Sequence, residues 1–315
     1  MSIRVSFPAP TAPHLTTPPR AFADEHLRTR PVAGEHQLLR ATVQEVTAPA
    51  RNLLRITVHS AALSDYQLSG PDEFFGLIMP RPGRTLQLPE HPQGENLRAA
   101  IADMPPKTRP DLRWYTVRLF DPDAGTLTFD VATHGKRRVN LATDTTGATT
   151  NDLGPGLRWS LRAQPGDEVG LWTTQGLWHQ AARHQTFIAD PSSLPSVRAI
   201  LDFTATFNPS QLGNMHVLAL RESEEDIEPG LQEWSDQLGS LHVFECPAAN
   251  FAPATAQYLA DLDRRAHPAT QADYVWVAGE GGLCKTVRRH CIHSWGLNPT
   301  DVQWCPYWFM GRPRP

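Results

Sequence analysis

The pattern of apolar residues changes near Gly176, and this change restricts the folds open to the chain. Before it, β-branched segments of alternating polarity follow one another with only turns between them, for example at 38–46, 53–58 and 126–131. After it, short apolar segments alternate with segments of helical character. Successive alternating strands favour an antiparallel sheet, whereas strands separated by helices favour a parallel one. The sequence therefore predicts an antiparallel β domain followed by an α/β domain with a parallel sheet.

The expected domain boundaries follow from this change of pattern. Residues 1–34 are rich in proline and lack periodicity, so an extended N-terminal arm is expected there. The β domain is expected at 35–180 and the α/β domain at 181–315. In the α/β domain the pattern predicts strands at 185–190, 215–220, 241–246 and 274–278, and helices at 193–203, 254–262 and 283–295.

Two details of the β domain can be predicted locally. The first two strands should form a hairpin that turns at Ala48-Pro49-Ala50, because this short stretch interrupts two β-branched runs. A polar, proline-rich insert at 81–110 is expected to be a surface loop.

Composition excludes several classes of protein. The 315 residues suffice for two domains, and 40% hydrophobic with 20% charged residues is typical of a globular chain. A formal net charge of −4 argues against nucleic-acid binding. Without a run of about 20 apolar residues or a signal-peptide core, we expect a cytoplasmic protein with no membrane insertion. The cysteines form no Cys-x-x-Cys pair and are expected to be reduced thiols; they are Cys246, Cys284, Cys291 and Cys305.

The segment Arg113–Arg118, followed by the turn Asp121–Gly125, reads as a strand that offers the chemistry a flavin nucleotide needs. Because side chains alternate along a strand, Arg113 and Tyr115 share one face and Thr116 lies on the other. A guanidinium can bind a pyrophosphate through two hydrogen bonds, a phenol ring can cover an isoalloxazine, and a hydroxyl can meet its polar edge. This strand is therefore a candidate FAD site.

Further motifs follow this strand in an order that resembles the siderophore-interacting proteins, a branch of the ferredoxin reductase superfamily. After the Arg-x-Tyr-Thr of residues 113–116 they are Asp130–Gly135, Gly154–Trp159, Gln164–Asp167, Val275–Glu280 and Pro306–Arg312. The resemblance spans about residues 36–312. It implies a six-stranded antiparallel flavin-binding β-barrel, an α/β domain in the place of the nicotinamide nucleotide, and FAD-dependent reduction of a ferric siderophore.

The resemblance also implies roles for individual residues. FAD contacts are expected at Arg113, Tyr115, Thr116, Val117, Val131, Thr133, His134, Gly135, Gly154 and Trp159. Contacts to a pyridine nucleotide are expected at Asp190, Gly279 and Glu280. Basic residues expected to attract the anionic siderophore are Lys136, Arg137, Arg138 and Arg312. No catalytic side chain and no metal ligand is expected, because the flavin carries the electrons and the iron arrives already chelated.

Three departures from the family pattern leave alternatives open. Leu157 replaces a serine, the loop at Asp190 lacks the family's glycine and glutamate, and Phe309 stands where the family has a basic residue. The donor could be NADH, NADPH or reduced ferredoxin. The alternatives to a reductase of ferric siderophores are a siderophore-binding protein without turnover and a general flavin reductase of the ferredoxin–NADP reductase type.

Overall fold

The computed structural model of the chain describes residues 36–90, 96–135, 153–179, 182–227 and 230–311. The expected N-terminal arm and the basic residues Lys136, Arg137, Arg138 and Arg312 lie outside these ranges. Among the helices that are described, none is both long and apolar enough to cross a membrane. Cys246, Cys284, Cys291 and Cys305 all carry free thiols.

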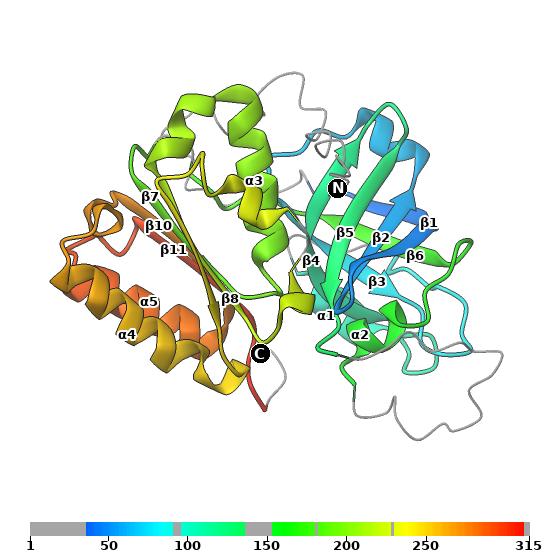
Figure 1. The fold of residues 1–315 in the computed structure, drawn as a ribbon. Coiled ribbons are helices and arrows are strands. Elements are labelled where there is room, and N and C mark those ends of the chain that lie inside the picture. Colours follow the sequence, from blue (N-terminus) through cyan, green and yellow to red (C-terminus); the bar gives the residue numbers. More distant parts are fainter. Residues whose placement is uncertain (1–35, 91–95, 136–152, 180–181, 228–229, 312–315) are drawn as a thin grey trace, which may run out of the picture.

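Within the described residues, six antiparallel strands close into a barrel in the order β1-β2-β5-β4-β3-β6 (Figure 1). The alternation of the sequence accounts for this: along β1, Leu39, Ala41 and Val43 are buried while the residues between them are exposed. The prediction of a six-stranded antiparallel barrel is confirmed. The strands are β1 (Leu38–Ala50), β2 (Leu53–His59), β3 (Phe74–Met79), β4 (Asp111–Asp121), β5 (Thr126–Ala132) and β6 (Glu168–Thr173).

Two local predictions in the barrel domain need correction. The first hairpin does not turn at 48–50, because β1 continues to Ala50, which pairs with Leu53; Pro49 sits at a break in register, where a strand tolerates proline. The insert at 81–110 is more than a surface loop, since it contains helix α1 (Leu97–Asp103). Leu97 and Ile101 of α1 are one helical turn apart and are buried in a small apolar cluster with Trp172.

The α/β domain forms a parallel sheet in the order β11-β10-β7-β8-β9 among the described residues, and this confirms the prediction. Figure 1 shows α3 on the face of the sheet toward the barrel, and α4 and α5 on the opposite face. The strands are β7 (Gln185–Ala189), β8 (Met215–Arg221), β9 (Ser240–Glu245), β10 (Tyr274–Glu280) and β11 (Val302–Trp308). The helices are α3 (Leu194–Phe207), α4 (Phe251–Arg264) and α5 (Gly281–His293). Short 3-10 turns lie at Ala61–Asp65, Pro209–Asn214, Glu224–Asp226, Leu231–Trp234, Ala248–Asn250 and Pro268–Gln271.

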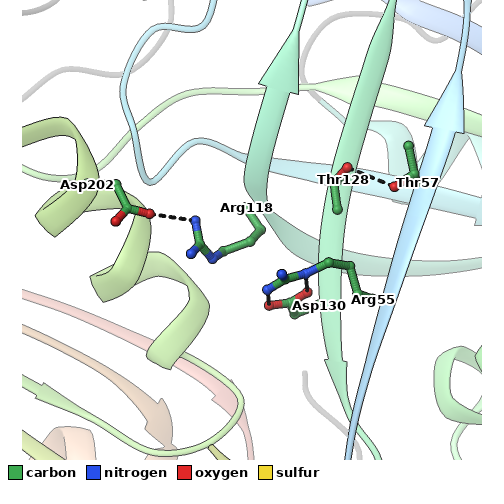
Figure 2. Close-up of polar contacts among 6 residues, drawn as sticks. All are labelled: Arg55, Thr57, Arg118, Thr128, Asp130 and Asp202. Carbon is green, nitrogen blue, oxygen red and sulfur yellow. Dashed lines mark hydrogen bonds and ion pairs between the residues drawn. The ribbon is translucent and has the colours of Figure 1, made fainter. Parts of the chain in front are cut away.

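The two domains are joined by buried polar contacts as well as by a shared apolar core. Arg118 of β4 donates to the Asp202 carboxylate of α3 over 2.8 Å, and both side chains are almost fully buried (Figure 2). Asp72, before β3, accepts hydrogen bonds from the main chain of Leu177 and Trp178 and from the indole of Trp276 in β10. These contacts fix the barrel against the sheet.

Candidate functional site

A cleft of about 230 Å³ lies where the barrel meets the α/β domain. The barrel contributes the flavin-type strand β4, the end of β5 and the start of α2 (Pro155–Ser160). The α/β domain contributes the start of α3 and the end of β11. The lining residues are Arg113, Trp114, Tyr115, Thr116, Asp130, Val131, Ala132, His134, Gly154, Gly156, Leu157, Ser192, Pro195, Tyr307 and Trp308.

Arg113 and Tyr115 share the face of β4 that meets α2, as strand alternation predicts. A Cβ atom at Gly156 would come within 2.7 Å of Arg113 Cγ and 2.6 Å of the Tyr115 hydroxyl, so the close approach of α2 requires glycine. The Arg113 guanidinium is exposed, and within the described residues it forms no ion pair with a carboxylate. Its charge is therefore available to an anionic group in the cleft.

Tyr115 is held between the cleft and the barrel core. Its ring lies 5.1 Å from that of Phe129, whose side chain is fully buried in the barrel. Burial raises the pKa of Tyr115, so its hydroxyl stays protonated at neutral pH. The phenol thus offers a ring of fixed orientation and a neutral hydroxyl.

Three hydroxyl groups from different elements meet at the inner end of the cleft. Ser196 of α3 donates to Thr116 Oγ1 over 2.9 Å, and the Tyr307 hydroxyl of β11 lies 3.2 Å from Thr116 and 3.1 Å from Ser196. Burial raises the pKa of Tyr307, which therefore remains a neutral donor. The hydroxyl of Thr116 is consequently tied to the second domain.

His134 lies at the mouth of the cleft, on a turn with left-handed backbone. Its φ is +51° and that of Gly135 is +75°. This turn places the exposed imidazole 5.8 Å from the ring of Trp308, across the boundary between the domains. His134 and Trp308 thus form the two sides of the entrance.

Four residues expected to contact FAD do not line this cleft, and one of them, Gly135, directly follows His134 on the turn at its mouth. Val117 is buried in the barrel core, at 2% exposure. Thr133 is also buried; its N–H donates to Asn52, and its hydroxyl has no hydrogen-bond partner among the described residues. Trp159 lies in a second cavity, of about 390 Å³, which α2 shares with the insert. The arginines that line this second cavity are Arg81, Arg84, Arg158 and Arg162.

The residues expected to bind a pyridine nucleotide lie together at the ends of two neighbouring strands. Asp190 follows β7 and is fully buried, while Gly279 and Glu280 end β10. Gly279 has a φ of +128°, and a side chain there would collide with the Asp190 carboxylate. Asp190 accepts a hydrogen bond from Glu280 N at 2.8 Å. The Asp190 carboxylate therefore faces the main chain of Gly279 and Glu280.

The chemistry of the cleft fits a flavin nucleotide. The Arg113 guanidinium, which has no carboxylate partner in the part of the chain that the structure describes, suits a pyrophosphate. The neutral hydroxyls suit the polar edge of an isoalloxazine, and the aromatic rings suit its faces. Tyr307, Trp308 and Ser192 were missed as site residues, although the C-terminal motif that contains the first two was a signal. Within the described ranges, no group of three or more His, Cys, Asp or Glu side chains could hold a metal ion.

Comparison with known proteins identifies both domains. Residues 42–178 match the model of the siderophore-interacting FAD-binding domain, and residues 182–311 match that of the siderophore-interacting protein. Ferric acinetobactin reductase of Acinetobacter baumannii is 25% identical over 232 residues, which cover 72% of this chain and 71% of the relative.

Solved structures show the same arrangement of domains. The siderophore-interacting protein SipS from Aeromonas hydrophila superposes with a TM-score of 0.64 at 25% identity, over 88% of this chain and 93% of that one. The flavohaem-like FAD/NAD-binding domain of nitric oxide dioxygenase from Vibrio cholerae has a TM-score of 0.55 at 12% identity, over 85% and 98% of the two chains. The second likeness concerns the fold alone.

Proposed function

Since the chain belongs to the siderophore-interacting protein family, we propose that it binds FAD in the cleft and uses it to reduce a ferric siderophore. Iron then leaves as Fe(II), which oxygen-rich chelators hold less tightly than Fe(III). Release of iron for use inside the cell also implies that the protein acts in the cytoplasm.

The observation that carries this proposal is the composition of the cleft. Arg113, Tyr115 and His134 of the barrel face Tyr307 and Trp308 of the α/β domain across a single opening. A cation, rings and neutral hydroxyls are thereby gathered from segments far apart in the sequence. A flavin nucleotide needs this combination, whereas a hydrolase would need a nucleophile beside a base.

The proposed mechanism gives the protein the tasks of binding, orienting and shielding. Bound FAD supplies the redox chemistry, because it can take up two electrons and pass them on one at a time. Arg113 binds the pyrophosphate, and Tyr115, fixed by Phe129, orients the ring system. The hydroxyls of Thr116 and Tyr307 would meet the polar edge of the isoalloxazine. To donate to it, one of them would give up its hydrogen bond within the group formed by Thr116, Ser196 and Tyr307. His134 lies at the entrance through which the chelated iron approaches.

Other residues predicted from the family pattern remain part of the proposal. Val131, Gly135 and Gly154 lie on the segments that border the cleft and are proposed to shape it. The basic residues Lys136, Arg137, Arg138 and Arg312 are proposed to attract the anionic siderophore.

The role of Arg113 can be tested by binding alone. The change Arg113→Ala removes charge-assisted hydrogen bonds that contribute about 1.5–3 kcal/mol to the binding free energy. The affinity for FAD should therefore fall by at least about tenfold. Titration of the flavin-free protein with FAD, followed by quenching of flavin fluorescence, measures this. Arg40→Ala, which removes an exposed arginine from β1, is the control and should bind FAD as the wild type does. Unchanged affinity in Arg113→Ala would refute the proposed pose.

The reaction itself can be tested without a biological donor. The FAD-loaded protein is reduced anaerobically with one equivalent of dithionite and mixed with ferric siderophores of the catecholate and hydroxamate classes, with ferric citrate or with a quinone. We expect reoxidation of the flavin and capture of Fe(II) by ferrozine to be fastest with one siderophore class. A reduced flavin that stays reduced would instead identify a binding protein, and equal rates with all acceptors a general flavin reductase.

A further inference from the structure

The C-terminal edge of the parallel sheet is where an α/β domain of this kind would bind a dinucleotide. In such sheets the pyrophosphate takes the free N–H groups at the start of the helix that follows a strand. Three strand-to-helix connections of the described residues lie at this edge. Those from β7 to α3 and from β10 to α5 follow the two neighbouring central strands, whereas the one from β9 to α4 follows the edge strand far from the cleft. Whether the N–H groups at the two central turns are free therefore decides whether a pyrophosphate can bind beside the cleft.

At the second turn, the side chain of Glu280 occupies the first N–H groups of α5. Its carboxylate accepts hydrogen bonds from Gly282 N at 2.5 Å and from Leu283 N at 3.0 Å. The other carboxylate oxygen lies 3.4 Å from Met310 N, beyond the end of β11. Two of the donors that could hold a phosphate, those of Gly282 and Leu283, are thus satisfied from within, by a group of the same charge as the phosphate.

At the first turn, Asp190 has the same effect on α3. Its carbonyl oxygen accepts from Ser193 N and Leu194 N at 3.0 and 2.9 Å, and its carboxylate accepts from Ser192 N at 2.9 Å. Pro195 has no N–H to offer. The other carboxylate oxygen accepts from Glu280 N and from the indole of Trp308, both at 2.8 Å. Both turns and the end of β11 are therefore bound together through Asp190.

The ring of Phe309 closes the second turn sterically. A Cβ atom at Gly281 would overlap this ring, so the ring lies directly against the first residue of α5. The space beside the main chain of α5, which a ribose or phosphate would need, is filled by the phenyl group.

We propose that Asp190, Glu280 and Phe309 exclude pyridine dinucleotides from the α/β domain. The donor that reduces the flavin must then dock without inserting a pyrophosphate at this edge. The inference concerns the donor and so rests on the proposed function. It replaces the sequence-based prediction that Asp190, Gly279 and Glu280 bind the nucleotide, and it assigns the opposite role to Asp190 and Glu280.

The test uses the FAD-loaded full-length protein. NADH and NADPH are titrated separately by isothermal calorimetry up to about 1 mM. This range detects a dissociation constant of about 1 mM, which corresponds to a binding free energy of about −4 kcal/mol. Anaerobic stopped-flow measurement then follows reduction of the flavin at 450 nm. We expect no saturable heat of nucleotide binding. We also expect the rate of flavin reduction to rise linearly with nucleotide concentration. Saturable binding of either nucleotide within this range would overturn the proposal.

Two variants test whether these residues cause the exclusion. Glu280→Gln keeps the size of the side chain but removes its charge, and Phe309→Ala removes the ring. At least one of them should bind NADH or NADPH saturably, with an apparent affinity about tenfold or more above that of the wild type. Glu45→Gln, which removes an exposed carboxylate from β1, is the control and should behave as the wild type. Failure of both variants to gain binding, with FAD content and circular dichroism unchanged, would overturn the assignment to these residues.

The two proposals fail in different ways. A protein that binds no FAD, or whose dithionite-reduced flavin does not react with ferric siderophore, contradicts the proposed function. Saturable calorimetric binding of NADH or NADPH contradicts only the exclusion, because that measurement depends on neither iron nor turnover.

Discussion

The close packing of strand β4 against helix α2 depends on the absence of one Cβ atom, at Gly156. Gly156 contacts both Arg113 and Tyr115 at distances that leave no room for a methyl group. The two side chains proposed to bind the pyrophosphate and to orient the flavin ring therefore depend on one missing Cβ atom. Their positions would change together if that atom were present.

Gly156→Ala should weaken FAD binding about fivefold or more while leaving the protein folded. The added methyl displaces the Tyr115 hydroxyl and the stem of Arg113, and such overpacking costs typically about 1–3 kcal/mol. Fluorescence titration with FAD measures the affinity, and circular dichroism confirms the fold. Gly213→Ala is the control, since a Cβ there meets no atom within 4 Å. Equal affinities in the two variants would contradict the packing argument.

A buried carboxylate in the barrel makes stability depend on pH. Glu73 is 1% exposed, accepts hydrogen bonds from Ser69 N at 2.7 Å and from the Tyr66 hydroxyl, and lies beside the buried Asp72. Burial raises the pKa of Glu73 from 4.5 to about 7 and that of Asp72 from 3.8 to about 6. A carboxyl whose folded pKa is raised binds more protons in the folded state, so it lowers stability as pH rises through this window.

The change Glu73→Gln should remove the part of this pH dependence that Glu73 causes. The free energy of unfolding of the variant minus that of the wild type is expected to increase by about 2–3 kcal/mol between pH 4.5 and pH 8, at 1.36 kcal/mol per pKa unit. Urea denaturation at a series of pH values gives this difference. Glu45→Gln should show no such trend, because Glu45 is exposed. If the difference in the free energy of unfolding between Glu73→Gln and the wild type did not change with pH, the buried carboxyl would have an ordinary pKa.

Strand β4 connects the cofactor cleft to the interface between the domains. Arg113 and Tyr115 face α2, Thr116 bonds to α3 and β11, and Arg118 pairs with Asp202 of α3. Beside it, Arg55 of β2 holds Asp130 of β5 through two hydrogen bonds of 2.8 Å, just before the turn that carries His134 (Figure 2). The cleft is thus built on strands fixed by buried ion pairs.

Asp202→Asn should destabilise the protein by about 3–5 kcal/mol, because it leaves the buried charge of Arg118 without its carboxylate. The double change Arg118→Met with Asp202→Leu should be less destabilising than the single one, since both charges are then removed. Urea denaturation measures both. Glu168→Gln, which breaks the exposed pair with Arg40, should change stability by less than about 1 kcal/mol. If Asp202→Asn lowered the free energy of unfolding as little as Glu168→Gln does, the argument would be contradicted.

On the scale of the whole molecule, the two domains share one core. The main apolar cluster contains Val117 and Phe129 of the barrel together with Val197 and Trp276 of the α/β domain. The polar contacts of Asp72 and Arg118 cross the same boundary. Neither domain can separate from the other without exposing part of this core.

The two domains should therefore unfold together. We expect a single transition in urea, with far-ultraviolet circular dichroism and tryptophan fluorescence giving the same midpoint. Saturating FAD should shift both signals equally, because it binds only the folded form. Two separate transitions would show that the domains are independently stable.

Several features could be predicted from the sequence because they depend on local pattern. The alternation of apolar and polar residues along 38–43 indicated a strand. The spacing of residues 113–116 placed Arg113 and Tyr115 on one face of a strand and Thr116 on the other. Strand β11 escaped prediction because it contains Pro306, which an edge strand tolerates but which breaks the local signal. Helix α1 escaped it because its buried residues, Leu97 and Ile101, are few and lie in a proline-rich insert.

The sequence by itself determined the order of barrel and parallel sheet, and the faces on which the flavin-strand side chains lie, because periodicity acts between neighbouring residues. Tertiary structure alone decided which residues share the cleft, and placed Trp159 in another cavity. It also decided that the N–H groups of Leu194, at the start of α3, and of Gly282 and Leu283, at the start of α5, are already bonded. The main-chain N–H of Glu280 bonds to a carboxylate 90 positions away, so whether such a donor is free depends on packing and not on local sequence.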